Sequence, residues 1–182
     1  MARIRVECDE VNLYDLRRTH FSSKTVDTLQ KVSKLLPQDA IFVNIGAYME
    51  SSTACILYGR PDIVAYSIDI EQCQDGLDNL EKLGLSAVRL LGTSQDHGRK
   101  WDSEIDMVYI DGDHSYESVK EDIELWVPWV KKNGFIAFHD YGTPHTPGVV
   151  KAVDEFVEEY GYPLFLRDGW DKEDVLRIYR VG

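Results

Sequence analysis

The sequence predicts an α/β fold: a three-layer sandwich with helices on both faces of a seven-stranded, mostly parallel sheet that ends in an antiparallel hairpin. Five short apolar runs between residues 41 and 138 alternate with segments of helical periodicity, which is typical of repeated strand–helix–strand units. Two final runs, Leu164–Leu166 and Val175–Val181, are joined by a connection too short for a crossover helix, so they form antiparallel neighbours. With 182 residues, the chain is expected to be one domain, in which residues 1–37 precede a core of residues 41–182.

Capping and breaking residues place the first elements. Residues 4–6 alternate apolar and charged side chains as in a short edge strand, and residues 11–21 suit either a helix or a flap over the site. Ser22 or Ser23 can cap a helix that Pro37 ends. The expected elements that follow are a strand at Ile41–Ile45, a helix through about Tyr58, a strand at Val64–Ile68, a helix at 72–82, a strand at Ala87–Leu91 and a short helix at 95–100.

Residues 105–141 give the strongest functional signal. Two apolar runs, Ile105–Ile110 and Phe135–Phe138, flank a helical pattern that Ser115 can cap and that continues to Val130. Acidic and imidazole groups follow both runs: Asp111, Asp113 and His114 after the first, and His139 and Asp140 after the second. Since the carboxyl ends of neighbouring parallel strands bind ligands in open α/β sheets, we expect a functional site here.

The last helix is separated from this unit by residues 141–148, a loop rich in proline and glycine. Thr146 as N-cap and Pro147 in the first turn start the helix, and Gly161 stops it.

Composition argues against several classes of function. The net charge is −12 and no run of basic residues occurs, so we expect neither nucleic acid nor a membrane surface as a partner. Cys8, Cys55 and Cys73 show no CxxC spacing, and we expect buried thiols in a reducing cytosol rather than disulfides or a zinc site. The sequence has no apolar signal core and no run of membrane-spanning length, so it predicts a cytoplasmic protein.

The ends of the first three core strands form a second group of candidate residues. Gly46 follows a buried strand and opens the next helix, where backbone amides attract an anionic or polar group. Asp69 ends the second strand, at the position where a carboxylate accepts hydrogen bonds from two ribose hydroxyls. Ser94 and Gln95 follow the third strand, where polar groups can border an adenine.

With these residues in place, the sequence resembles the class I S-adenosylmethionine-dependent methyltransferases. The closer likeness is to small-molecule O-methyltransferases of the catechol O-methyltransferase type and to related bacterial domains that carry IDGDHSY. The matching segments are NIGAYMESST (44–53), YSIDIE (66–71), LLGTSQD (90–96), IDMVYIDGDHSYESVKED (105–122) and GFIAFHDY (134–141). The resemblance implies a Rossmann-like fold, O-methylation of a small-molecule acceptor, and S-adenosylmethionine as the cofactor, with Mg²⁺ as a second cofactor in a metal-assisted form of the reaction.

The resemblance also implies the residues that bind the cofactor. Gly46 and Tyr48 would lie along its methionine portion, and Ser52 would reach its carboxylate. Asp69 would hold the ribose, and Ser94 and Gln95 would border the adenine. The expected cofactor-binding residues are Asn44, Gly46, Tyr48, Ser52, Asp69, Ser94, Gln95 and Asp111.

For the chemical step, the resemblance implies a metal-binding pair and a base. Asp111 and Asp140 fall where the family places two Mg²⁺ ligands, and His114 falls where the catechol enzymes place the lysine that takes the acceptor proton. The expected catalytic residues are therefore His114, Asp111 and Asp140. His139, beside them, can belong to the same group or be a buried histidine bonded to the backbone.

Departures from the family pattern leave other functions open. Glu50 stands where the family usually has glycine and would place a charge near the cofactor's carboxylate, and Asn44 replaces an acid that steadies the cofactor's amino group. A rival hypothesis is therefore a degenerate, non-catalytic methyltransferase-fold domain that acts through protein partners. A dinucleotide-dependent oxidoreductase shares the expectation for Asp69, but the chain lacks GxGxxG.

The acceptor pocket is the part that the sequence specifies least. The acceptor can be a sugar, a polyol or a phenol. The short region before the first core strand leaves the pocket either open or completed by a second subunit, as in a homodimer. Tyr141 stands where the third metal ligand of the family is often Asn or Asp.

Overall fold

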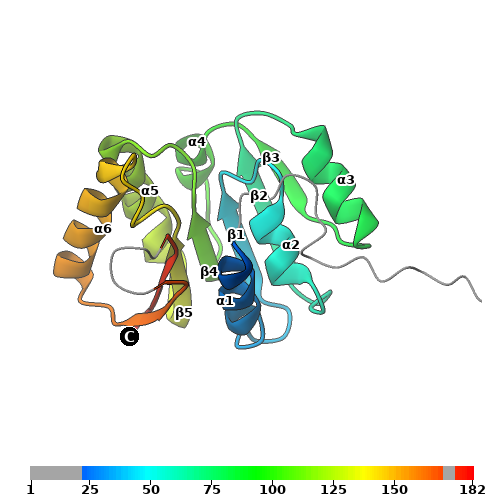
Figure 1. Ribbon diagram of the computed structural model, residues 1–182, viewed down its shortest axis with the longest axis horizontal. Coiled ribbons are helices and arrows are strands. Elements are labelled where there is room, and N and C mark those ends of the chain that lie inside the picture. Colours follow the sequence, from blue (N-terminus) through cyan, green and yellow to red (C-terminus); the bar gives the residue numbers. More distant parts are fainter. Residues whose placement is uncertain (1–21, 170–174) are drawn as a thin grey trace, which may run out of the picture.

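The structure is a computed structural model that describes residues 22–169 and 175–182. Its seven strands form one sheet in the order β3-β2-β1-β4-β5-β7-β6 (Figure 1). The strands are β1 Ile41–Ile45, β2 Val64–Asp69, β3 Val88–Leu91, β4 Ile105–Ile110, β5 Val130–Phe138, β6 Leu164–Arg167 and β7 Arg177–Arg180. β1 to β5 pair in parallel, and β7 runs antiparallel to both β5 and β6. The predicted fold class and the terminal hairpin are confirmed.

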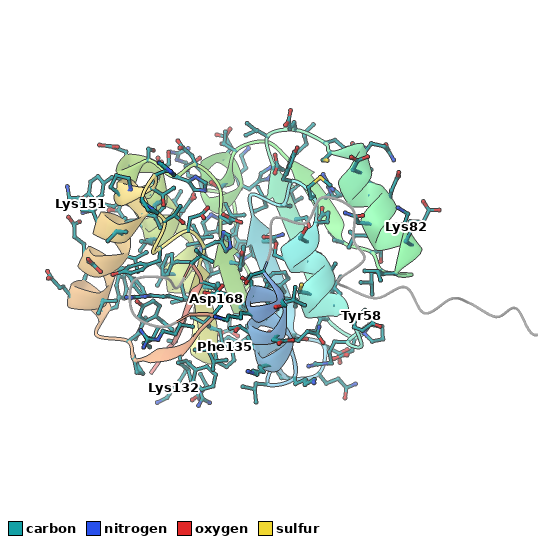
Figure 2. The ribbon with its side chains drawn as sticks, viewed as in Figure 1. Tyr58, Lys82, Lys132, Phe135, Lys151 and Asp168 are labelled. Carbon is teal, nitrogen blue, oxygen red and sulfur yellow. The ribbon has the colours of Figure 1, made fainter. Side chains whose placement is uncertain are left out.

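Helices cover both faces of this sheet. They are α1 Ser23–Ser33, α2 Ser51–Leu57, α3 Gln74–Lys82, α4 Ser94–Gly98, α5 Tyr116–Trp126 and α6 Pro147–Tyr160. The exposed Lys82 of α3 and Lys151 of α6 lie toward opposite ends of the long axis (Figure 2). None of the described helices is long and apolar enough to span a membrane.

Two hydrophobic cores result from the alternation of side chains along the central strands. In β1, Phe42 belongs to the core under α1 and α2, whereas Val43 belongs to the core under α5 and α6. Met107 and Val108 divide in the same way in β4. Each of these side chains is fully buried, which contributes about 1.5–3 kcal/mol apiece to folding.

The end of α5 differs from the prediction. The helix was expected to continue to Val130 and the next strand to start at Phe135, but α5 ends at Trp126 and a 3₁₀ turn, Val127–Trp129, leads directly into β5. Pro128 is the physical reason, because proline has no backbone N–H to donate inside a helix. Val130 is buried by pairing with Ile105 of β4, not by the helical face that its spacing suggested.

The predicted N-cap residues lie at the starts of α1, α5 and α6, and one of them makes no capping bond. Ser22 accepts a hydrogen bond from the amide of Thr25 (3.1 Å), and Ser115 accepts one from the amide of Ser118 (3.3 Å), so both are N-caps. Thr146 occupies the N-cap position of α6 without a side-chain cap; its hydroxyl instead donates to the carbonyl of Asp140 at 2.7 Å. This bond fastens the loop after β5 to the start of α6.

The terminal hairpin is tied to α1 by a buried carboxylate. Asp168, labelled in Figure 2, accepts a hydrogen bond from the hydroxyl of Thr25 at 2.5 Å. Its second oxygen accepts from the amides of Val175 and Leu176, each at 3.0 Å. The strand expected at residues 4–6 and the helix or flap expected at 11–21 lie outside the described residues.

Candidate functional site

The turn after β1 fixes how closely the central strands approach each other. Gly46 has φ +78°, and a Cβ built there would lie 2.0 Å from the carbonyl oxygen of Asp111. The amide of Asp111 in turn donates to the carbonyl of Ile45 at 3.0 Å. Position 46 therefore excludes every side chain, because the obstacle is backbone.

This crossing of Gly46 and Asp111 forms the wall between two cavities at the carboxyl ends of the strands. The first, which we call the β2–β3 cavity, has a volume of about 540 Å³ and is lined by the ends of β2 and β3. The second, the β4–β5 cavity, has a volume of about 560 Å³ and is lined by the ends of β4 and β5 and the start of α2. Both lie within the size range of small-molecule sites. The residues that line both cavities are Gly46, Tyr48, Asp111 and Gly112.

Asp69 enters the β2–β3 cavity with a fixed carboxylate. One of its oxygens accepts from the amide of Tyr48 at 2.7 Å, and the other accepts from the amide of Glu71 at 3.1 Å. Each oxygen keeps lone pairs for a further donor. The geometry therefore suits a ligand that offers two neighbouring hydroxyl groups.

Ser94 and Gln95 line the same cavity and share one buried partner. Asp122 of α5, which is 1% exposed, accepts from the hydroxyl of Ser94 at 2.5 Å and from the side-chain amide of Gln95 at 3.0 Å. Burial raises the pKa of the Asp122 carboxyl to about 7. Sequence reasoning missed Asp122. The pattern that could have identified it is an acidic residue between Val119 and Ile123 on the apolar side of a helix.

The start of α2 differs from the expectation. The helix was predicted to open at Gly46, but it begins at Ser51, and the amides of Gly46 and Ala47 both donate to the carbonyl of Ile68 (3.0 and 3.2 Å). Both amides therefore donate to a backbone carbonyl of the protein. Ser52, in the first turn of the helix, lines the β4–β5 cavity together with Gly46 and Tyr48.

Asn44 and Glu50 lie away from both cavities, in a buried polar row. Arg89 donates to one oxygen of Glu50 at 2.5 Å, and Ser67 donates to the other at 2.8 Å. Thr53 continues the row to Asn44, whose amide donates to its hydroxyl at 2.8 Å. Neither Asn44 nor Glu50, which is 0% exposed, therefore lines either cavity.

Glu50 is unusual in its backbone as well as in its burial. Its φ is +57°, the left-handed region that glycine adopts without cost, and it precedes the first residue of α2. Burial raises the pKa of Glu50, while Thr53, Ser67 and Arg89 act in the opposite direction. The ion pair with Arg89 is therefore what makes a charged residue compatible with this position.

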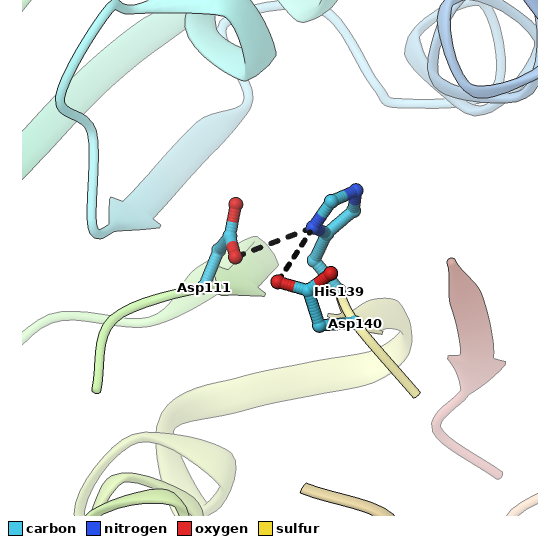
Figure 3. Close-up of side chains that lie close together, drawn as sticks. All are labelled: Asp111, His139 and Asp140. Atoms are coloured by element: carbon cyan, nitrogen blue, oxygen red, sulfur yellow. Dashed lines mark ion pairs between the residues drawn. The ribbon is translucent and has the colours of Figure 1, made fainter. Parts of the chain in front are cut away.

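Four side chains converge at the ends of β4 and β5, in the β4–β5 cavity. Nδ1 of His139 lies 3.3 Å from Oδ1 of Asp111 and 3.4 Å from Oδ2 of Asp140 (Figure 3). Nε2 of His114 lies 3.1 Å from the same oxygen of Asp140 and 3.6 Å from that of Asp111. We call these four residues the Asp–His cluster. The structure brings the three predicted catalytic residues together and adds His139.

The two carboxylates hold positive charge on both imidazoles. Asp111 and Asp140 raise the pKa of His114 to about 10. Burial opposes the charge on His139, but the same two carboxylates outweigh burial and raise its pKa to about 10. Hydrogen bonds from His114 and His139 hold the pKa of Asp140 well below its usual range. At neutral pH the cluster therefore pairs carboxylates with imidazolium groups.

Three residues of this cluster can also supply ligands to a divalent cation. One ligand atom each from Asp111, His139 and Asp140 lie within 4.8 Å of one another. Two carboxylates supply the oxygens that Mg²⁺ prefers, and an imidazole adds a donor that transition metals accept more readily than Mg²⁺ does. These residues fit a metal, and the remaining ligands would have to come from water or an acceptor.

Tyr141 does not join this set. Its hydroxyl donates to Asp154 of α6 at 2.6 Å, and the guanidinium of Arg177 lies 3.5 Å from the centre of its ring. The side chain is therefore engaged by α6 and β7, not by the Asp–His cluster.

Comparison with solved structures shows the fold. A Staphylococcus aureus protein provisionally assigned as a caffeoyl-CoA O-methyltransferase superposes with a TM-score of 0.69 at 17% identity, covering 90% of this chain and 86% of that one. CalS11, a TDP-rhamnose 3′-O-methyltransferase of calicheamicin biosynthesis, gives 0.65 at 18% identity over 92% and 82% of the two chains. A Clostridium thermocellum protein provisionally assigned as an rRNA methylase gives 0.69 at 12% identity over 90% and 99%.

Sequence comparison shows the family. An Acanthamoeba polyphaga mimivirus protein with no stated function is 25% identical over 154 residues, which is 77% of this chain and 66% of that protein. The family model described as "Methyltransferase domain" (Methyltransf_24) matches residues 43–141, more than half of the chain, and this segment contains both strand-end groups of candidate residues. With the seven-stranded sheet described above, this match establishes that the chain belongs to the Methyltransf_24 family of methyltransferase domains and has the Rossmann-like fold of the class I S-adenosylmethionine-dependent methyltransferases.

Proposed function

We propose that the protein transfers a methyl group from S-adenosylmethionine to a hydroxyl group of a small molecule. The observation that carries this proposal is the pair of cavities that share the wall of Gly46 and Asp111. In the proposed complex the nucleoside lies in the β2–β3 cavity with its ribose on Asp69. The acceptor lies in the β4–β5 cavity beside the Asp–His cluster, with the methyl group between the two.

The chemistry requires positioning and removal of a proton. The C–S bond of the sulfonium breaks as the bond from carbon to the acceptor oxygen forms, and the hydroxyl proton has to leave. His114, which is 43% exposed at the cavity and in contact with both carboxylates, is the proposed proton acceptor. To act in this way it must first lose the proton that Asp111 and Asp140 stabilise.

A divalent cation is part of this proposal. Asp111 and Asp140 would hold it, with His139 as a third donor, and when bound it supplies positive charge that lowers the pKa of an acceptor hydroxyl. The same carboxylates can serve a cation or the imidazolium charges. We therefore expect metal binding and protonation of His114 and His139 to compete.

The proposed acceptor is a sugar, a polyol or a phenol. Two structural neighbours are named for a TDP-rhamnose and a caffeoyl-CoA acceptor, and a third is named as an rRNA methylase. The net charge of −12 favours the small-molecule acceptors over RNA, since a phosphate backbone would be repelled. For the same reason we do not propose a nucleic-acid partner.

Calorimetric titration with S-adenosylmethionine, S-adenosylhomocysteine and NAD⁺ tests the cofactor. We expect micromolar binding of both adenosyl ligands and no binding of NAD⁺. Asp69→Ala should weaken the binding of S-adenosylhomocysteine at least tenfold, whereas Asp62→Ala, which removes a surface partner of Arg60, should leave it unchanged. Equal affinities of the wild type and the Asp69 variant would refute the assignment of the ribose site.

A second test separates chemistry from cofactor binding. His114→Ala and Asp140→Asn should abolish turnover with any acceptor that the wild type uses, while the affinity for S-adenosylhomocysteine stays within about twofold. Turnover that survives both substitutions would remove the proposed base and metal ligand. Manganese binding, followed by the loss of the free Mn²⁺ resonance, tests the metal site without reference to activity.

The rival hypothesis of a degenerate domain rests on Glu50 and Asn44. The charge of Glu50 is paired with Arg89 outside both cavities, which supports the proposed function over this rival. Failure of the purified protein to bind either adenosyl ligand would favour the rival instead.

A further inference from the structure

Asp122 lies behind the wall of the β2–β3 cavity rather than in it. The residue is on α5, is 1% exposed and is absent from the lining of the cavity. Ser94 and Gln95, which do line the cavity, both point a donor at the same oxygen of Asp122, at 2.5 and 3.0 Å. The carboxylate therefore reaches a ligand only through these two side chains.

A carboxylate oxygen fixes the orientation of both neighbours. The reverse orientation of the Gln95 amide would place its carbonyl oxygen against Oδ1 of Asp122, two acceptors about 3 Å apart, which is unfavourable. The carbonyl oxygen of Gln95 is thus the group left for a ligand. Ser94 donates its hydroxyl hydrogen to Asp122, so its oxygen can act only as an acceptor toward the cavity.

The rest of this wall adds another acceptor. Asp113, which also lines the cavity, accepts from the hydroxyls of Ser115 (3.1 Å) and Ser118 (2.9 Å). A ligand that meets Ser94, Gln95 and Asp113 therefore meets oxygen acceptors, and a group that donates hydrogen bonds is favoured there. A proton on the other oxygen of Asp122 would leave Oδ1 an acceptor and keep this arrangement.

We propose that Asp122 is a specificity-determining positioning residue: by holding Ser94 and Gln95 as acceptors, it makes the cavity select a base with an exocyclic amino group over its oxo analogue. The inference rests on the proposed function, since it assumes that the adenosyl part of the cofactor occupies the β2–β3 cavity. An oxo base would set its carbonyl oxygen against the oxygen of Gln95. A buried polar group without a partner costs about 1–3 kcal/mol, which corresponds to a preference of roughly 5- to 150-fold.

The test compares S-adenosylhomocysteine with S-inosylhomocysteine. In the inosyl ligand an oxo group replaces the amino group of the base, and N1 carries a hydrogen. The wild type should bind the adenosyl ligand at least about fivefold more tightly. Asp122→Asn keeps a side-chain carbonyl oxygen that can hold Ser94 and Gln95 as before, so the decisive variant is Asp122→Leu. It removes the acceptor and frees the Gln95 amide to turn its NH₂ group toward the cavity. The adenosyl preference should then fall at least about fivefold, with inosyl affinity gained as adenosyl affinity is lost.

A role of Asp122 in packing alone gives a different result. Loss of packing would weaken both ligands by the same factor, whereas the proposed role changes their ratio. Glu121→Gln is the matched control: Glu121 is the preceding residue on α5, and its partner is Arg99 at the surface. The ligand ratio of this control should equal that of the wild type.

Gln95→Met provides a second route that does not require Asp122→Leu to fold. It removes the oriented amide at similar length, and the preference for the adenosyl ligand should fall at least fivefold. An unchanged ratio in either folded variant overturns the inference. A wild-type protein that binds neither ligand instead refutes the proposed function, and one that binds both equally refutes only the inference.

Discussion

Arg89→Met gives the sharpest test of the energetics of the buried polar row. The substitution removes the cation that contacts Glu50 at 2.5 Å and leaves a carboxylate that is 0% exposed with Ser67 as its main remaining donor. Removing one partner of a buried ion pair costs about 3–5 kcal/mol. Since the side chain of Arg89 is 23% exposed, we expect the lower end, about 3 kcal/mol. For a chain of this length that is a fall in melting temperature of roughly 6–12 °C.

The dependence on pH follows from the sign of the pKa shift. Burial raises the pKa of Glu50 above 4.5, and loss of Arg89 removes a group that opposes this rise. The folded variant therefore keeps a proton that the unfolded chain releases above pH 4.5, and its stability falls as the pH increases. The difference between wild type and variant should be small at pH 4 and largest at neutral pH.

Urea unfolding at several pH values measures this difference. Glu50→Gln combined with Arg89→Met removes both charges and should recover most of the lost stability. Arg99→Met removes a surface ion pair with Glu121 and should cost no more than about 1 kcal/mol. A loss in Arg89→Met that is the same at pH 4 and pH 8, or a double variant no more stable than the single one, would refute the reasoning.

Three further substitutions test other parts of the site. Gly46→Ala should abolish binding of S-adenosylhomocysteine and lower the melting temperature, because its Cβ would meet the backbone of Asp111. A folded variant with normal affinity would contradict the close approach of Gly46 to Asp111. Asp122→Asn should make stability depend less on pH. Burial raises the pKa of the Asp122 carboxyl from 3.8 to about 7, so the stability of the wild type falls as the pH rises between these values. Urea unfolding should show a smaller fall in the variant. Asp140→Asn should lower the pKa of His114 from about 10, which a histidine NMR titration detects, and an unchanged value would mean that Asp111 alone holds the charge.

Much of the fold could be predicted because the strand-forming runs are short, apolar and bounded by breakers. The same property explains why Asp69 and Asp140 could be placed. Asp69 is the last residue of β2, Asp140 lies two residues after the end of β5, and the carboxyl ends of parallel strands meet at one edge of the sheet. The predicted end of α5 was wrong because the spacing of Val127 and Val130 fits a buried helix as well as a buried strand. Pro128 was the residue that decided between them.

The partners of the candidate residues could not be predicted in the same way. The contact of Asp122 with Ser94 crosses from one helix to the start of another, 28 residues away in sequence. Glu50 was expected near the cofactor because it stands where the resembling family usually has glycine, but its side chain points toward Ser67 of β2 and Arg89 of β3. Local pattern identifies which residues stand at a strand end, whereas the direction of a side chain there depends on elements that are remote in the chain.

The polar row of Asn44, Ser67 and Arg89 has a consequence for the alignment of the strands. These residues are direct partners across β1, β2 and β3, and α2 supplies Thr53 and Glu50 to meet them. A slip of β2 by one residue would turn Ser67 to the other face and leave the Glu50 carboxylate against apolar side chains. Parallel strands made of valine and isoleucine have similar hydrophobic energies in several registers. The polar row is therefore what restricts the three strands to one register.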